Sequence, residues 1–199
     1  MCIYMTDNKI KQLYTNNIQN LMASGEQNAD FLALSAALIS QTLLSGNKVL
    51  TCGDTLCSMI ADHFAGILVN YYEIERPSLP AIALSNTAHT CAFEPLDNNH
   101  LIDVYARQIR AMGNAQDILV VFSINNRELS IKSAIEAALT NDIQVIAFTS
   151  DDGGEIAGLL GENDIEIRLP TNKPSRTLEI QLFTVHVLSE LIDEVIFSM

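Results

Sequence analysis

The chain has 199 residues, of which 48% are hydrophobic and 18% are charged, a composition typical of one globular domain and not of a disordered chain. Its 24 acidic and 11 basic residues give a formal net charge of -13, which opposes direct binding to nucleic acid or to an anionic membrane and favours a basic partner. No run reaches the ~18 uninterrupted apolar residues of a membrane span, and polar residues interrupt the N-terminus too early for a secretory signal.

We therefore expect a single domain over residues 1–199 in the cytoplasm. The cysteines follow neither a disulfide framework nor a metal-binding CxxC pattern, so we expect reduced thiols at Cys2, Cys52, Cys57 and Cys91.

Two helices are expected before the first strand. Apolar residues recur at helical spacing between residues 6 and 24, and a second helix rich in Ala and Leu is expected from about Asn28 to Leu44, with Gly46 as its C-cap. We assign these helices, within residues 1–46, to oligomerisation, and residues 47–199 to an α/β core.

From Lys48 onward, short apolar runs alternate with helical segments. Strands are expected at 48–52, 81–85, 117–123, 143–149 and 164–169, and helices at 55–71, 102–112, 128–139 and 176–197, with a helical turn at 154–160. The strands lack polar alternation, which is typical of strands buried on both faces. Strands that alternate with helices predict right-handed crossovers and a doubly wound parallel sheet of five strands, with a long C-terminal helix, in the α/β class.

Several helices are apolar around most of their circumference, above all the second and the last. A helix that is apolar all round is usually buried, so part of this surface is expected to pack against another subunit. A thick core within a monomer is the alternative.

Ligands of an open parallel sheet bind at the carboxyl ends of its strands, which here lead into the loops 52–58, 85–89 and 123–130. A phosphate needs small residues, backbone N–H donors and hydroxyls. In the first loop, bulky Leu56 and the negative charge of Asp54 oppose phosphate binding. In the third loop, Asn125 is expected as a helix N-cap with Glu128 as its capping-box partner, so that Glu128 satisfies the helix dipole in place of an anion.

Two histidines and one cysteine could carry chemistry. A zinc site needs three or four ligands, but the residue one turn after His63 is Ile67 and the residue two turns before His186 is Leu178. A structural role for both histidines is the simpler interpretation. Cys57 lies near a helix start, which could lower the pKa of its thiol, although no base accompanies it. A metal site built from His63, His186 and Cys57 is a further hypothesis.

Several runs of the sequence resemble one known family. They are Cys52-Gly53, ADHFA at 61–65, ERPSLPAIAL at 75–84, DDGGEIAGLLG at 151–161 and RTLEI at 176–180. Together they resemble the sugar isomerase (SIS) domain, in the branch of phosphoheptose isomerase and its non-enzymatic relative DiaA, over nearly the whole chain. Two of these runs, ERPSLPAIAL and DGGEIAGLLG, point to the DiaA type more than to the isomerase. The resemblance implies a flavodoxin-like core and a homotetramer.

Carried over residue by residue, the isomerase pattern of this family is broken. Its two histidines match His63 and His186. Its catalytic glutamate falls on Ile67, and its glutamine ligand falls on Leu178. Two histidines without the carboxylate cannot run the enediol proton transfer of aldose–ketose isomerisation. We therefore expect no catalytic residues, no cofactor and no metal.

The phosphate loops of the family are also altered. The first loop reads GDTLCS where glycine, asparagine and serine are usual, and the family's serine falls on Cys57. In the third-strand loop Ser123 alone matches a hydroxyl of the pattern, and the other hydroxyl positions hold Ile124, Asn125 and Glu128. The expected result is a degenerate phosphosugar cleft, whose residues are Asp54, Cys57, Ser123, Asn125 and Glu128.

The DiaA resemblance also implies a partner. Such proteins bind several copies of the replication initiator DnaA, and an aliphatic–Phe pair near the C-terminus contributes to the contact; here Ile196-Phe197 matches that pair. Phe197 could instead be buried within the tetramer. We expect a homotetrameric adaptor that binds DnaA and promotes initiation of chromosome replication, and the alternative is a sedoheptulose 7-phosphate isomerase or a phosphosugar-binding regulator.

Overall fold

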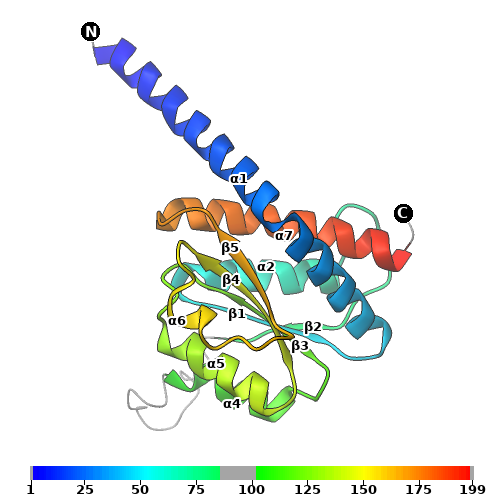
Figure 1. Cartoon of the computed structure of the whole chain (residues 1–199). Helices are drawn as coiled ribbons and strands as arrows, with labels where there is room; N and C mark the ends of the chain where they lie inside the picture. The colour runs from blue at the N-terminus through cyan, green and yellow to red at the C-terminus, as the bar shows by residue number, and fades with distance from the viewer. Residues whose placement is uncertain (1, 86–101, 198–199) are drawn as a thin grey trace.

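The computed structural model describes residues 2–85 and 102–197, with side chains from residue 7 onward apart from residue 55 (Figure 1). Residues 86–89 of the second candidate loop, and Cys91, lie outside the described residues.

Five strands form one parallel sheet, as the sequence predicts. They are β1 (Val49–Gly53), β2 (Ala81–Ala83), β3 (Ile118–Phe122), β4 (Gln144–Ser150) and β5 (Ile165–Leu169), in the spatial order β2-β1-β3-β4-β5. The register pairs Val49 of β1 with Ile118 of β3, and Ile118 with Gln144 of β4. All residues of β1 and β3 are buried, which explains why their sequences are apolar without alternation.

Helices cover both faces of the sheet (Figure 1). One face carries α2 (Ser58–Val69), α7 (Pro174–Phe197) and the C-terminal half of α1 (Cys2–Leu44); the other carries α4 (Val104–Met112), α5 (Leu129–Thr140) and the short α6 (Gly154–Ala157). Successive residues of β3 alternate between these layers, so that Val120 packs with the first layer and Val121 with the second. Within residues 2–85 and 102–197, no helix combines the length and the apolar character that crossing a membrane would require.

The prediction of two N-terminal helices is wrong, because residues 2–44 form one continuous helix. The segment around Gly25 stays helical through a tertiary contact of Asn28, whose side chain is buried. The Asn28 amide donates to the carbonyl of Arg168 in the edge strand β5 at 2.9 Å and accepts the Arg168 N–H at 3.1 Å. These two bonds offset the roughly 1 kcal/mol that a glycine costs in a helix interior.

The end of β1 is fixed by two features of Gly53. A Cβ at this position would collide with the main chain of Cys57, so only glycine lets the following turn fold back over the strand. The hydroxyl of the buried Tyr105, in α4, donates to the Gly53 carbonyl at 2.8 Å. A short 3-10 turn, η1 (Thr55–Cys57), then leads into α2. The first candidate loop is therefore held from both layers of the fold.

Candidate functional site

The chain changes direction across the sheet between β1 and β3, because β2 lies on one side of β1 and β3 on the other. In parallel α/β sheets this switch point opens a crevice at the carboxyl ends of the two strands, where ligands bind. The loops after β1 and β3 bring together three of the predicted cleft residues, Asp54, Cys57 and Ser123, all of them buried.

Asp54 and Ser123 are joined directly across this crevice. The Ser123 hydroxyl donates to the Asp54 carboxylate, with Oγ and Oδ2 2.5 Å apart, and the Ile124 N–H donates to the same oxygen at 3.0 Å. Asp54 is 2% exposed and Ser123 is fully buried. The buried carboxylate therefore accepts hydrogen bonds from two donors of the loop after β3.

Cys57 faces helix α7. Its thiol donates to the side-chain oxygen of Gln181 at 3.0 Å, and the Gln181 amide donates to the Ser123 carbonyl at 2.9 Å. Burial, and next the negative charge of Asp54, raise the pKa of the Cys57 thiol. The hypothesis of a pKa lowered by the helix start is therefore wrong, because desolvation of the thiolate outweighs the dipole.

Gln181 was missed by the sequence reasoning, although it is fully buried and links Cys57 to the third-strand loop. The available signal was a glutamine on an otherwise apolar face of the last helix. A buried amide needs hydrogen-bond partners, and these could have been sought among the strand-end loops.

The predicted capping box in the third-strand loop is wrong. Helix α5 begins at Leu129, with Glu128 as an N-cap residue whose side chain makes no capping bond, and the exposed Asn125 accepts the N–H of Arg127 at 3.0 Å. The reason lies in Asn126, which takes a left-handed conformation with φ of 57°. Its buried side chain donates to the Ser150 carbonyl at 2.6 Å and accepts the Ser150 N–H at 3.2 Å, which ties the loop to β4 and delays the helix.

The two histidines lie on neighbouring helices and contact each other. The Nε2 atoms of His63 in α2 and His186 in α7 are 2.9 Å apart, within hydrogen-bonding distance. His186 also stacks on Tyr72, with ring centroids 5.5 Å apart. Burial, and next the proximity of His63, lower the pKa of His186.

The positions that flank the histidine pair are apolar. Ile67 is buried in the core, and the partly buried Leu178 packs against the same core. In the part of the chain that the structure describes, no three His, Cys, Asp or Glu side chains are grouped to hold a metal ion. The pair can exchange a proton between its rings, but Ile67 offers it no carboxylate.

The predicted partner-binding pair lies at the end of α7. Ile196 and Phe197 are half-buried and pack against the core. The guanidinium carbon of Arg76 lies 5.6 Å from the centroid of the Phe197 ring, an arrangement suited to a cation–π interaction.

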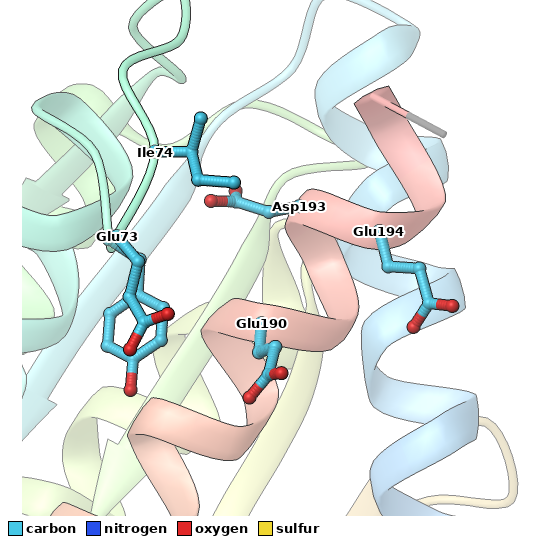
Figure 2. Close-up of a pocket in the computed structure, with 6 residues that line it drawn as sticks. Glu73, Ile74, Glu190, Asp193 and Glu194 are labelled. Atoms are coloured by element: carbon cyan, nitrogen blue, oxygen red, sulfur yellow. The ribbon is translucent and has the colours of Figure 1, made fainter. Parts of the chain in front are cut away.

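An acidic pocket of about 320 Å³ is formed by the loop after α2 and by α7 (Figure 2). The close-up shows Glu73 and Ile74 on the loop after α2, and Glu190, Asp193 and Glu194 on α7. Asp193 is paired with Arg76, whereas Glu73, Glu190 and Glu194 are exposed. The pocket thus presents negative charge, and Arg76 links its residue Asp193 to the half-buried ring of Phe197.

Fold and site together define the class of the protein. Residues 13–150 match the SIS domain, and the chain belongs to the SIS domain family. A phosphoheptose isomerase from Francisella tularensis has a similar structure, with a TM-score of 0.87 and 32% identity over 95% of this chain and 98% of that one. A phosphoheptose isomerase from Neisseria gonorrhoeae gives a TM-score of 0.85 and 26% identity over 95% and 99%.

Within the family, the chain is similar to DiaA. It is 43% identical over 190 residues to the DnaA initiator-associating protein DiaA of Yersinia enterocolitica, which covers 95% of this chain and 96% of that protein. The resemblance expected from the sequence motifs and the expected fold class are both confirmed.

Proposed function

We propose that this protein is a non-catalytic adaptor of the DiaA type, a homotetramer that binds DnaA and promotes initiation of chromosome replication. Similarity to DnaA initiator-associating proteins over 95% of the chain supports the partner. The observation that carries the absence of catalysis is Ile67: the position of the family's glutamate holds an apolar residue that is buried in the core.

The end of α7 suits the proposed contact. Phe197 is a half-buried aromatic residue at a chain end, and buried aromatic anchors often dominate binding energy. Glu190 and Glu194 add exposed negative charge to the adjacent pocket, which complements a basic partner surface and speeds association. An apolar anchor with an acidic rim is therefore the proposed DnaA-binding surface.

Helix α1 supports self-assembly. Its N-terminal half projects away from the body of the molecule (Figure 1) and exposes an apolar stripe, with exposed fractions of 47% at Ile10, 70% at Tyr14 and 55% at Ile18. A groove of about 410 Å³ lies where this helix meets α7, lined in part by Leu13 and Arg176. A large exposed apolar stripe marks an interaction surface, so we assign residues 1–46 to the tetramer interface.

The test is direct binding of the purified protein to DnaA at two salt concentrations. The Phe197→Ala variant should lose at least about tenfold in affinity, while Val195→Ala, an exposed residue on the same helix, should bind like the wild type. Light scattering of each variant must show an unchanged tetramer. Absence of wild-type binding at both salt concentrations would reject the adaptor function.

One observation favours a second candidate, a phosphosugar isomerase or phosphosugar-binding regulator. The structural neighbours at 32% and 26% identity are phosphoheptose isomerases, and the matching histidines lie together here. Turnover of sedoheptulose 7-phosphate, abolished by His186→Gln, would establish the isomerase. A melting temperature that rises with this sugar phosphate, without turnover, would establish the regulator.

A further inference from the structure

The carboxylate of Asp54 lies where an anionic ligand of this fold would be held. Asp54 directly follows β1 and its partner Ser123 directly follows β3, so that their contact spans the crevice at the switch point of the sheet. Ligands of such sheets enter at this point, and phosphates are held there by hydroxyls and backbone N–H groups.

The donors in the crevice are directed at the carboxylate. The Ser123 oxygen accepts the Asn126 N–H at 3.0 Å, so its single proton is free to point at Asp54 Oδ2, 2.5 Å away. The Ile124 N–H also donates to both carboxylate oxygens, at 3.0 and 3.3 Å. A hydroxyl and a main-chain N–H converging on one oxygen are the donor set that a phosphate oxygen would require.

The main chain holds the Asp54 carboxylate in this place. The Asp54 N–H donates to the Phe122 carbonyl at 3.0 Å, and the Asp54 carbonyl accepts the Cys57 N–H at 2.6 Å. The Gln181 amide closes the arrangement by bonding Cys57 and the Ser123 carbonyl. Asp54, Ser123 and Gln181 are all at most 2% exposed, so the carboxylate is an integral part of the crevice and not a mobile surface group.

We propose that Asp54 is the resident anion of this crevice: its carboxylate takes the donors that a phosphate ester would bind, and thereby excludes such esters from the wild-type protein. Replacing the carboxylate by a small neutral group opens an anion site that accepts inorganic phosphate and phosphate monoesters. Two effects act together. The Asp54 carboxylate already accepts the available hydrogen bonds, and its negative charge repels a second anion in a poorly solvated site. The inference concerns ligand exclusion and goes beyond the adaptor function, because DnaA binding does not depend on it.

The decisive experiment is rescue of a cavity variant by an external anion. Asp54→Ser should lower the melting temperature, and phosphate should restore it in part, compared with chloride at matched ionic strength. Wild-type protein should show no phosphate-specific rise. Asp54→Asn keeps the shape and an acceptor but loses the charge, so it should respond at least about tenfold more weakly than Asp54→Ser.

Two controls separate a local anion site from general salt effects. Ser123→Ala in the Asp54→Ser background removes the hydroxyl donor and should abolish the rescue. Asp164→Ser removes a carboxylate that also accepts main-chain N–H groups, from Val145 at 2.8 Å and Gly161 at 2.7 Å, but at the amino end of β4. This variant should be destabilised without any phosphate-specific recovery.

The outcomes are distinct. A phosphate response of Asp54→Ser that Ser123→Ala removes supports the proposal. A folded Asp54→Ser that does not respond overturns it. If Asp54→Ser fails to fold, the wild type decides. Saturable binding of phosphate or sedoheptulose 7-phosphate to the wild-type protein, followed by ³¹P NMR, overturns the proposal, and the absence of such binding supports it. DnaA binding measured on the same proteins reports on the adaptor function separately.

Discussion

The guanidinium of Arg76 and the carboxylate of Asp193 form a buried ion pair, with Nε and Oδ1 2.7 Å apart and side-chain exposures of 2% and 9%. The same guanidinium donates to the carbonyls of Leu68 and Ile67 at the end of α2. It also lies over the ring of Phe197. One cation therefore joins the end of α2 to the end of α7, and it does so directly beneath the surface proposed to bind DnaA.

Asp193→Asn should be strongly destabilising, because it leaves the Arg76 charge buried without its counter-ion. Breaking one side of a buried pair costs about 3–5 kcal/mol in the free energy of unfolding. Urea unfolding followed by circular dichroism measures this loss.

Glu179→Gln is the matched control for this substitution. Glu179 pairs with Arg176 on the same helix, but its side chain is 44% exposed. Exposed pairs of this kind contribute at most about 1 kcal/mol, so the control should unfold close to the wild type. Equal losses in the two variants would mean that the Arg76–Asp193 pair does not hold the two helices together.

The exposed carboxylates of the acidic pocket predict salt-dependent binding to DnaA. The double substitution Glu190→Gln and Glu194→Gln should slow association at low salt, and its effect should fade at high salt, because exposed charges act over about one Debye length. Association rates measured by stopped flow or surface plasmon resonance at low and at high salt concentration test this prediction. An equal loss at every salt concentration would point to lost contacts and not to electrostatic attraction.

The sheet could be predicted from the sequence, and the site only in part, for a physical reason. Buried parallel strands can be recognised from short apolar runs in the local sequence. The continuity of α1, in contrast, depends on hydrogen bonds between Asn28 and Arg168, which are 140 positions apart. The same holds for Gln181, which meets Cys57 across 124 positions. Local patterns predict local structure, and hydrogen bonds between distant segments lie beyond them.

Candidate site residues illustrate the same limit. The sequence placed Asp54 and Ser123 in loops at the carboxyl ends of two strands, and the strand order of the structure makes these strands neighbours. The role of Asn126 could not be read from the neighbouring capping signal, because its contact with Ser150 decides where α5 begins. The local capping box of Asn125 and Glu128 does not form, because the buried hydrogen bonds between Asn126 and Ser150 fix the loop in another conformation.

The histidine pair predicts a pH dependence of stability. The pKa of His186 lies below its ordinary value of about 6.5, so near that pH the unfolded chain binds more protons than the folded one. The contribution to the free energy of unfolding is complete above about pH 6.5 and is lost as the pH falls toward the pKa of the folded state. Denaturant unfolding at about pH 7.5 and about pH 5.5 should therefore show a drop that is smaller in His186→Gln.

His63→Gln provides a second arm for this measurement. It removes the facing imidazole, which contributes to the lowered pKa of His186, so an NMR titration should find that pKa closer to its ordinary value. An unchanged His186 titration would show that the two rings are not coupled. A pH dependence that is identical in the wild type and His186→Gln would contradict the prediction for stability.

The buried thiols of Cys52 and Cys57 should be inert in the native protein. Burial, and then the charge of Asp54, raise the pKa of both, and the thiolate is the form that reacts with alkylating agents. Brief treatment with iodoacetamide at mildly alkaline pH, followed by peptide mass spectrometry, should leave both unmodified, while both should react in urea. Rapid native labelling of Cys57 alone would mean that η1 opens away from Gln181. The carbonyl of Asp54 accepts the Cys57 N–H, so the same opening would also release Asp54 from its place. Slow labelling of Cys57 is therefore expected if the Asp54 carboxylate stays in its site in the native protein.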